Sequence, residues 1–222
     1  MHWQDEGYIL SKSNYNENSI IIETFTLNHG KCAGIVYGGT SRKQKKNYQI
    51  GNKVFLNWKS KGENRVGYFN TELIKAILPK FFDDKRKTIC VLAATSILRI
   101  LLPDKQINKK IYLSFEKLTD DFDHDNWIEM YIFWELSLVK ELGYEISLSE
   151  ELIDNNIGNN IKINDKKFII PKLLLKNEKI NTTKKDIIDA LLFNKNLIME
   201  NFLIPNRLKL PFSRNILEKY YY

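Results

Sequence analysis

Four cationic side chains fall within five residues of one stretch: Arg42, Lys43, Lys45 and Lys46. They belong to residues 38–49, Gly-Gly-Thr-Ser-Arg-Lys-Gln-Lys-Lys-Asn-Tyr-Gln, whose glycines indicate a loop. Like charges at this density repel one another, so folding gains nothing from them. Small residues at its start allow the backbone to approach a phosphate. The stretch therefore predicts contact with a nucleic-acid backbone, which supplies affinity without sequence information, and a merely solvated lysine loop is the alternative.

The predicted DNA-binding site extends onto the neighbouring segments. It adds the cations Lys31, Lys53, Lys59 and Lys61 and two aromatic residues, Tyr48 and Phe55. Aromatic rings between positive charges are typical of surfaces on which single-stranded bases stack. Trp58 shares a strand face with Val54 and Leu56, which favours a place in the core over a stacking role.

Catalytic signals are weak. His2, His29 and His124 lie far apart in the sequence, and His29 falls in a turn. Four aspartates around His124, from Asp120 to Asp125, resemble a metal cluster, but they also bracket a predicted helix junction, where Asp125 is a candidate N-cap. The two cysteines, Cys32 and Cys90, are expected to be small buried hydrophobes. We therefore expect neither an enzyme, nor a metal, nor a cofactor.

The charge distribution supports a polyanionic partner. The chain has 222 residues, 43% hydrophobic and 27% charged, with a net charge of +7. Residues 31–80 hold 11 basic and two acidic residues, whereas residues 81–150 hold nine and 13. A uniform genomic drift toward lysine codons would not leave an acidic middle. The basic N-terminal third thus indicates a surface for a polyanion.

The elements that must position this site are short strands. β-Branched and aromatic runs predict strands at 7–10, 19–27, 31–37, 52–61 and 65–74, separated by turn residues. Five strands in about 75 residues without an intervening helix are typical of a small barrel. An oligonucleotide/oligosaccharide-binding (OB) barrel fits, and an SH3-like barrel is an alternative.

From about Pro79 the hydrophobic period becomes helical. Helices are predicted at about 89–100, 107–122, 125–142 and 183–203, the third ending before Gly143 and the fourth starting at a Thr183/Asp186 capping box. Residues 162–171 read as a hairpin with its turn at Asn164-Asp165, and Ser213 as the cap of a last helix. The predicted fold class is α+β: an N-terminal five-stranded OB-type barrel at 1–78, then an α-helical domain with a small hairpin insertion at 79–222.

Targeting signals are not visible. The longest uncharged apolar run is far below the roughly 20 residues of a membrane span, and the N-terminus is polar and acidic. Two cysteines cannot form a disulfide framework. We expect a cytoplasmic, nucleoid-associated protein without membrane contact.

At several points the chain resembles the RecO family of bacterial recombination mediators. The opening Trp3-x-Asp5-Glu6-Gly7-x-Ile9-Leu10 is similar, and the most specific match is His29-Gly30-Lys31 followed by Gly34-x-Val36-x-Gly38-Gly39-x-Ser41-Arg42-Lys43. Gln49-x-Gly51-Asn52, Trp58 and Gly67-x-Phe69-x-x-Glu72 continue the order. Phe133-Trp134-Glu135-Leu136-x-Leu138-x-x-Glu141-Leu142-Gly143-Tyr144 resembles the central helix, and Leu210-Pro211-x-Ser213-Arg214 a C-terminal signature.

The resemblance implies an OB barrel followed by a helical domain that binds single- and double-stranded DNA and anneals complementary strands. It implies DNA repair and recombination in the RecF pathway, in which contacts with RecR and with the acidic C-terminal tail of single-stranded-DNA-binding protein help to load RecA. Many relatives carry four zinc-binding cysteines around 150–182. This sequence has none there, so we expect a degenerate lobe without zinc.

The acidic tail requires basic residues around apolar ones. In the helical part this combination occurs at five cations: Lys109, Lys110, Arg207, Lys209 and Arg214. We expect the helical domain, not the barrel, to bind the tail. Two other functions stay open, an RNA-binding protein of translation that uses the same barrel and a nucleic-acid-processing enzyme.

Overall fold

The structure is a computed structural model that describes residues 1–62, 66–144, 160–164, 166–175 and 182–222. The chain divides into two compact units, Met1–Thr119 and Asp120–Tyr222, and each is described by itself. Within the described residues, no helix combines the length and apolar character needed to cross a membrane.

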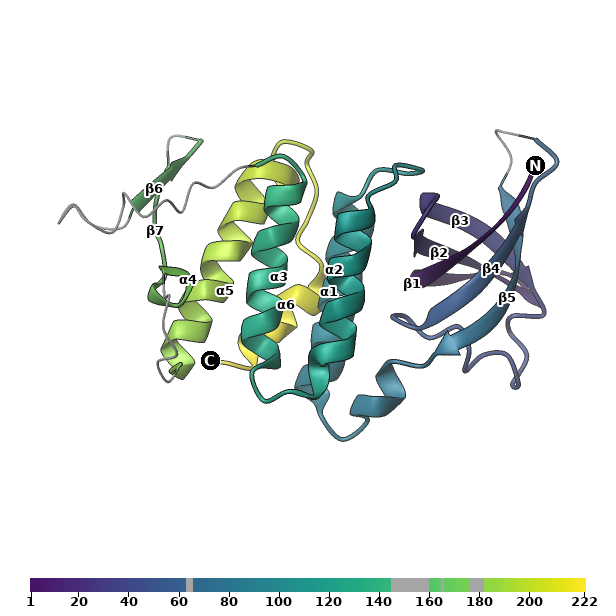
Figure 1. Cartoon of the computed structure of the whole chain (residues 1–222), viewed down its shortest axis with the longest axis horizontal. Coiled ribbons are helices and arrows are strands. Elements are labelled where there is room, and N and C mark those ends of the chain that lie inside the picture. The colour runs from purple at the N-terminus through teal and green to yellow at the C-terminus, as the bar shows by residue number, and fades with distance from the viewer. Residues whose placement is uncertain (63–65, 145–159, 165, 176–181) are drawn as a thin grey trace. The chain divides into compact units, whose positions relative to one another are not determined.

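The first unit contains a closed five-stranded barrel (Figure 1). Its strands are β1 (His2–Asn16), β2 (Ser19–Thr26), β3 (Gly30–Tyr37), β4 (Lys53–Lys59) and β5 (Gly67–Lys75). They close in the order β1-β2-β3-β5-β4, antiparallel except for a short parallel pairing of β3 with β5. This strand order confirms the OB-type barrel, and all five predicted strands are present.

Strand alternation builds the core of the barrel. Val54 and Leu56 of β4 are fully buried, and Trp58 packs partly buried against the same cluster, as their shared face predicts. The first strand is much longer than the expected 7–10, because its polar half pairs with β2 as far as Asn16 opposite Ser19. Polar residues at the exposed end of a hairpin carry no hydrophobic period, so this extension could not be predicted from the sequence.

Two helices pack against the barrel within the first unit. After a short 3₁₀ turn (Leu78–Phe81) come α1 (Lys85–Leu101) and α2 (Lys109–Asp120). Tyr8 of β1 stacks edge-on against Phe115 of α2, and both are buried. The change from strand to helix thus lies near 78, as expected, but the compact unit that contains the barrel extends through α2.

The second unit is mainly helical. It contains a 3₁₀ turn (Asp121–Asp123), α3 (Trp127–Glu141), the hairpin β6 (Asn160–Ile163) and β7 (Lys166–Ile169), α4 (Lys172–Leu175), α5 (Lys184–Ile198), a π-helical turn (Met199–Leu203) and α6 (Phe212–Lys219). In Figure 1 the hairpin and α4 lie beside α5, and α4 contacts α5. The central α3 buries Trp127, Tyr131 and Trp134, as its apolar composition predicts.

Two of the four helix ends predicted from the sequence are confirmed. The capping box of Thr183 and Asp186 is confirmed, and so is Gly143, whose φ of +96° suits a glycine after a helix. Two predicted caps are wrong. Asn126, not Asp125, precedes α3, and α6 begins before Ser213 with Pro211 at its N-cap, because the rigid ring already sets the backbone there.

A buried arginine network joins α3 to α6 in the second unit. Arg214 donates to both carboxylate oxygens of Glu135, at 2.6 and 3.0 Å, and to the carbonyl oxygen of Leu191 at 2.8 Å. Tyr131 also donates to Glu135, and Glu218 lies 3.8 Å from Arg214. We call Arg214, Glu135, Glu218 and Tyr131 the arginine network; Arg214 and Glu135 are fully buried. Additional hydrogen-bond partners of this kind help to offset the cost of removing a charge pair from water.

Candidate nucleic-acid interface

Residues 38–49, here called the basic loop, form a series of turns between β3 and β4. The Ser41 amide donates to the Gly38 carbonyl, and the Lys45 amide to the Ser41 carbonyl. The four cations Arg42, Lys43, Lys45 and Lys46 are all exposed. The structure therefore presents this predicted cluster to solvent on a compact loop.

Two buried residues fix the loop to the barrel. Asn52, fully buried, donates from its side chain to the carbonyls of Lys46 (3.3 Å) and Asn47 (3.1 Å). Tyr48 is only 3% exposed, and its hydroxyl lies 2.7 Å from that of Thr71. The prediction that Tyr48 stacks on bases is therefore wrong, because its ring belongs to the barrel core and serves as an anchor.

Two of the lysines predicted to bind DNA form ion pairs with carboxylates of this chain. Lys31 lies 3.2 Å from Asp104 and donates to the Arg99 carbonyl. Lys53 binds Glu6 and Glu116, each at 2.7 Å. Burial alone would lower the pKa of Lys53, but the hydrogen bonds that its ammonium group donates to Glu116 and Glu6 outweigh burial and raise the pKa. The side chains of Lys31 and Lys53 are only 15% and 14% exposed. Their assignment to the DNA-binding site is therefore corrected: both lysines form ion pairs within the folded protein.

The outer face of β4 divides into two parts. Half-buried Phe55 pairs across the sheet with Glu6 on one side and Glu72 on the other. Carboxylates on both sides repel a phosphodiester, so Phe55 is a poor stacking residue. Lys59 and Lys61, in contrast, are exposed, and Lys59 pairs with Tyr68 of β5.

Three further surface residues lie near the basic loop, and the predicted DNA-binding site did not include them. Tyr37 and Tyr68, 67% and 38% exposed, have ring centroids 6.2 Å apart; we call them the tyrosine pair. Tyr37 directly precedes the basic loop. Lys12 of β1 is exposed. Its pKa is lowered, first by partial burial and second by repulsion from the positive charge of Lys45. Strand alternation marks both tyrosines as outward neighbours of Val36 and Phe69, but Lys12 gives no local signal.

A cleft of about 860 Å³ opens at one end of the barrel. On one side Trp3 stacks on His29 (centroids 4.1 Å apart, planes at 10°) and on Trp58 (5.3 Å, 15°). Lys105 and Ile107 also line the cleft. We call it the aromatic cleft.

Buried Asp5 holds the stacked histidine in place. It lies 2.8 Å from His29 Nδ1 and accepts hydrogen bonds from the backbone and side chain of Asn28 and from the Glu6 amide. Burial raises the pKa of Asp5, but the hydrogen bonds with His29, Asn28 and Glu6 outweigh it and hold that pKa below its usual value. The carboxylate of Asp5 thus fixes the imidazole of His29 in the turn between β2 and β3.

The predicted tail-binding cations do not share one environment. Arg214 belongs to the arginine network and is 0% exposed, so its assignment to the acidic tail is wrong: a partner cannot reach a charge that Glu135 already holds. Arg207 and Lys209 are exposed, with the partly exposed Leu208 between them, in the segment that connects the π-helical turn to α6. Lys109 and Lys110 are exposed at the start of α2, in the first unit.

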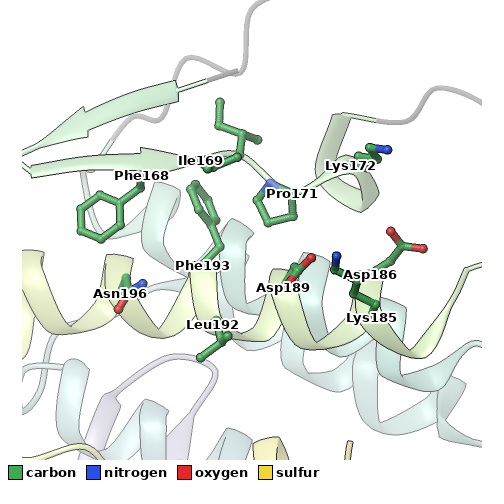
Figure 2. Close-up of a pocket in the computed structure, with 11 residues that line it drawn as sticks. Phe168, Ile169, Pro171, Lys172, Lys185, Asp186, Asp189, Leu192, Phe193 and Asn196 are labelled. Carbon is green, nitrogen blue, oxygen red and sulfur yellow. The ribbon is translucent and has the colours of Figure 1, made fainter. Parts of the chain in front are cut away.

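A pocket of about 420 Å³ lies between the hairpin and α5 (Figure 2). In Figure 2, Phe193 points from α5 toward Phe168 and Ile169 of β7. Lys172, Lys185, Asp186 and Asp189 bring two charges of each sign to the lining. None of the five predicted tail-binding cations lines this pocket, and its balanced charge gives no preference for an acidic ligand.

The candidate catalytic groups do not converge. Within the described ranges, no three His, Cys, Asp or Glu side chains come close enough to hold a metal ion. Cys32 lines the aromatic cleft, but burial raises its pKa to about 11, which leaves the thiol protonated at neutral pH. Much of the region expected to be a degenerate zinc lobe lies outside the described residues.

Comparisons with known proteins agree with this architecture. Residues 1–77 match the family model "Recombination protein O N terminal", and residues 83–179 match "Recombination protein O C terminal". The chain is 34% identical over 174 residues to a DNA repair protein RecO of Ehrlichia chaffeensis, covering 78% of this chain and 68% of the relative.

Two further relatives bear the same name. A Wolbachia pipientis protein from Culex pipiens is 34% identical over 152 residues, and a Roseobacter denitrificans protein 33% identical over 149. These alignments cover 68% and 67% of this chain, and the chain spans 62% of the length of either relative. With both family models matched in order along the chain, and with the OB-type barrel in the place where the first of them matches, this chain belongs to the RecO family.

Proposed function

We propose that the chain is a non-enzymatic DNA repair protein that binds single- and double-stranded DNA on the outside of its barrel. The observation that carries the proposal is the basic loop: four exposed cations fixed to the core by Asn52 and Tyr48. A loop that is already ordered loses little conformational freedom when it binds. The tyrosine pair, next to Lys59 and the loop, offers rings for base stacking.

Membership of the RecO family supports the proposal of a wider role. A surface that binds the backbone without reading bases suits any sequence, which the annealing of complementary strands requires. We propose that the chain anneals such strands and, in contact with RecR, helps to load RecA in the RecF pathway.

The first experiment measures the affinity for fluorescent single-stranded DNA at several salt concentrations. Log affinity is expected to fall linearly with log salt, by about 0.7 per neutralised phosphate. Replacement of Arg42, Lys43, Lys45 and Lys46 together by Ala should make this slope shallower by roughly two to three units. An RNA of equal length, measured at the same salt, tests the alternative of an RNA-binding protein.

A matched control keeps the net charge of that variant. Four exposed lysines of the second unit, Lys162, Lys167, Lys172 and Lys219, are replaced by Ala instead. The salt slope should stay near that of the unchanged protein. An equal loss of slope in both variants would show that binding follows net charge alone, and the assignment to the basic loop would be wrong.

We further propose that the second unit binds the acidic C-terminal tail of single-stranded-DNA-binding protein. Arg207 and Lys209 carry the charge, and Leu208 and Phe212, 40% and 77% exposed, offer apolar contact. The buried Arg214 is no longer part of this site.

The tail site is tested by fluorescence anisotropy with a tail peptide and the whole chain. The double variant Arg207→Ala/Lys209→Ala should bind the peptide several-fold more weakly. Lys109→Ala/Lys110→Ala is the matched control in the first unit. If the control loses affinity and the first double variant keeps it, the tail binds to the first unit instead.

A further inference from the structure

We propose that the aromatic cleft binds one unstacked nucleobase of single-stranded DNA, a second contact besides the basic loop; this inference rests on the proposed function. The cleft lies at the mouth of the barrel, and a volume of about 860 Å³ is well above that of one nucleotide. Its walls come from all five strands, from the turn between β2 and β3 and from the segment before α2.

The stacked rings give the cleft its preference for a flat ligand. His29, Trp3 and Trp58 are nearly parallel and half-buried. A planar base continues such a stack, whereas an aliphatic side chain covers only part of it. Trp3 stacks with both His29 and Trp58, so these two rings are the ends of the stack.

The charges at the rim favour a ligand with one negative charge. Of the two carboxylates that line the cleft, Glu23 is held by Arg99 and Asp104 by Lys31. Lys105 is exposed, and within the described residues its amino group forms no ion pair. Lys105 is therefore available at the rim to the phosphate that accompanies a base.

The cleft is also close in sequence to the proposed DNA-binding surface. Gly67 lines it, and the next residue, Tyr68, belongs to the tyrosine pair on the opposite face of β5. A Cβ at position 67 would come within 2.2 Å of Trp58 Nε1, so glycine is required beside the indole. A strand that stacks on Tyr68 has to pass only the edge of the barrel to place a base in the cleft.

The test uses intrinsic tryptophan fluorescence of the whole protein. The probes are a short oligothymidylate and an abasic oligonucleotide with the same number of phosphates. A base bound against the stack of His29, Trp3 and Trp58 should quench emission with the thymidylate and not with the abasic strand. Trp3→Phe and Trp58→Phe variants assign the signal, because Trp127 and Trp134 are buried in the second unit and give a constant background.

A blocked cleft separates base binding from backbone binding. Ala33→Phe adds bulk in the cleft from an exposed strand position and keeps the charge, and Ser13→Phe is the control on β1 outside it. Ala33→Phe should lower thymidylate affinity about 5- to 100-fold and leave abasic affinity unchanged. Lys105→Gln should make the salt slope shallower by about 0.7, whereas Lys109→Gln should not. A milder change, Ile107→Ser at a half-exposed position, should give the same pattern as Ala33→Phe without any risk to folding.

Three outcomes would overturn the inference. One is equal quenching by the thymidylate and the abasic strand, and another is an Ala33→Phe variant and an Ile107→Ser variant that both bind thymidylate normally. The third is an acidic peptide with a terminal phenylalanine that fills the cleft more tightly than the thymidylate. If the basic-loop variant keeps its salt slope while cleft-specific quenching remains, only the proposed loop surface fails. If the slope falls and quenching is absent, only the cleft assignment fails.

Discussion

Arg42 of the basic loop and Arg214 of α6 are the same residue type, and the sequence assigned an anionic partner to both. Arg42 is exposed on a loop that the core holds in place. Arg214 is buried and paired with Glu135, a residue 79 positions earlier in the chain. The comparison teaches that local sequence shows where a charge is, whereas its availability depends on partners that only the fold brings near.

The two regions also differ in what holds them. The basic loop is fixed through two neutral groups, Asn52 and Tyr48, and not through its cationic side chains. In the arginine network the charges themselves join α3 to α6. Removing one partner there leaves an uncompensated buried charge, which costs far more than the pair contributes as a whole.

The largest expected effect is therefore in the network. Arg214→Met should lower the free energy of unfolding by about 3–5 kcal/mol, measured by urea denaturation, because Glu135 is left buried without its counter-charge. The double variant Arg214→Met/Glu135→Met should regain part of that loss. A decrease below about 1 kcal/mol would mean that water reaches the network and that Arg214, like the loop cations, contributes little to stability.

The next effect concerns Asp5, a buried charge inside the barrel. Asp5→Asn should destabilise by about 1–3 kcal/mol at neutral pH, because the hydrogen bonds with His29, Asn28 and Glu6 lose a charged acceptor. The folded pKa of Asp5 lies below its unfolded value. Its stabilisation is therefore complete above the unfolded pKa of about 3.9 and is lost as pH falls through the folded pKa.

Unfolding midpoints between about pH 2 and pH 5 check this linkage. The decline of stability with acid should be shallower in Asp5→Asn than in the unchanged protein. Identical acid limbs would show that Asp5 has the same pKa in the folded and the unfolded chain.

A smaller effect is expected for Lys53, whose burial is intermediate between that of exposed Arg42 and that of fully buried Arg214. Lys53→Met removes the link between Glu6 of the barrel and Glu116 of α2 and should cost about 1 kcal/mol. It should leave the salt slope of DNA binding unchanged, while the exposed neighbour Lys59→Met should change the slope and not the stability. The reverse pattern would return Lys53 to the DNA-binding surface.

The smallest effect on stability is expected in the basic loop. Replacing its four cations by Ala should change the free energy of unfolding by no more than about 0.5 kcal/mol, despite the fall in salt slope. A large loss of stability in the same denaturation experiment would mean that these charges have structural partners.

Much of the fold could be predicted because its signals are local. The β-branched runs of β2 and β3, the alternation in β4 and the capping box at Thr183 each depend on residues close in sequence. The exposed loop cations were found for the same reason, since glycines and a dense charge run are visible without a fold.

The rest depends on contacts between distant residues. Tyr48 stands within a polar loop, and only its contact with Thr71 shows that the ring is buried. Lys31 and Lys53 have partners at Asp104 and Glu116, which the sequence does not bring together. The aromatic cleft likewise requires Trp3, His29 and Trp58 to meet from three separate segments.

The buried side chain of Asn52 has a consequence for local opening. Its oxygen accepts from the Ile77 amide at 3.1 Å, while its nitrogen donates to the carbonyls of Lys46 and Asn47. One amide group thus closes both the root of the basic loop and the exit from β5. Deuterium uptake at Ile77 should then rise and fall with uptake in the loop, as one cooperative opening unit. We therefore expect release of the loop to be coupled to opening of the segment that leads to α1.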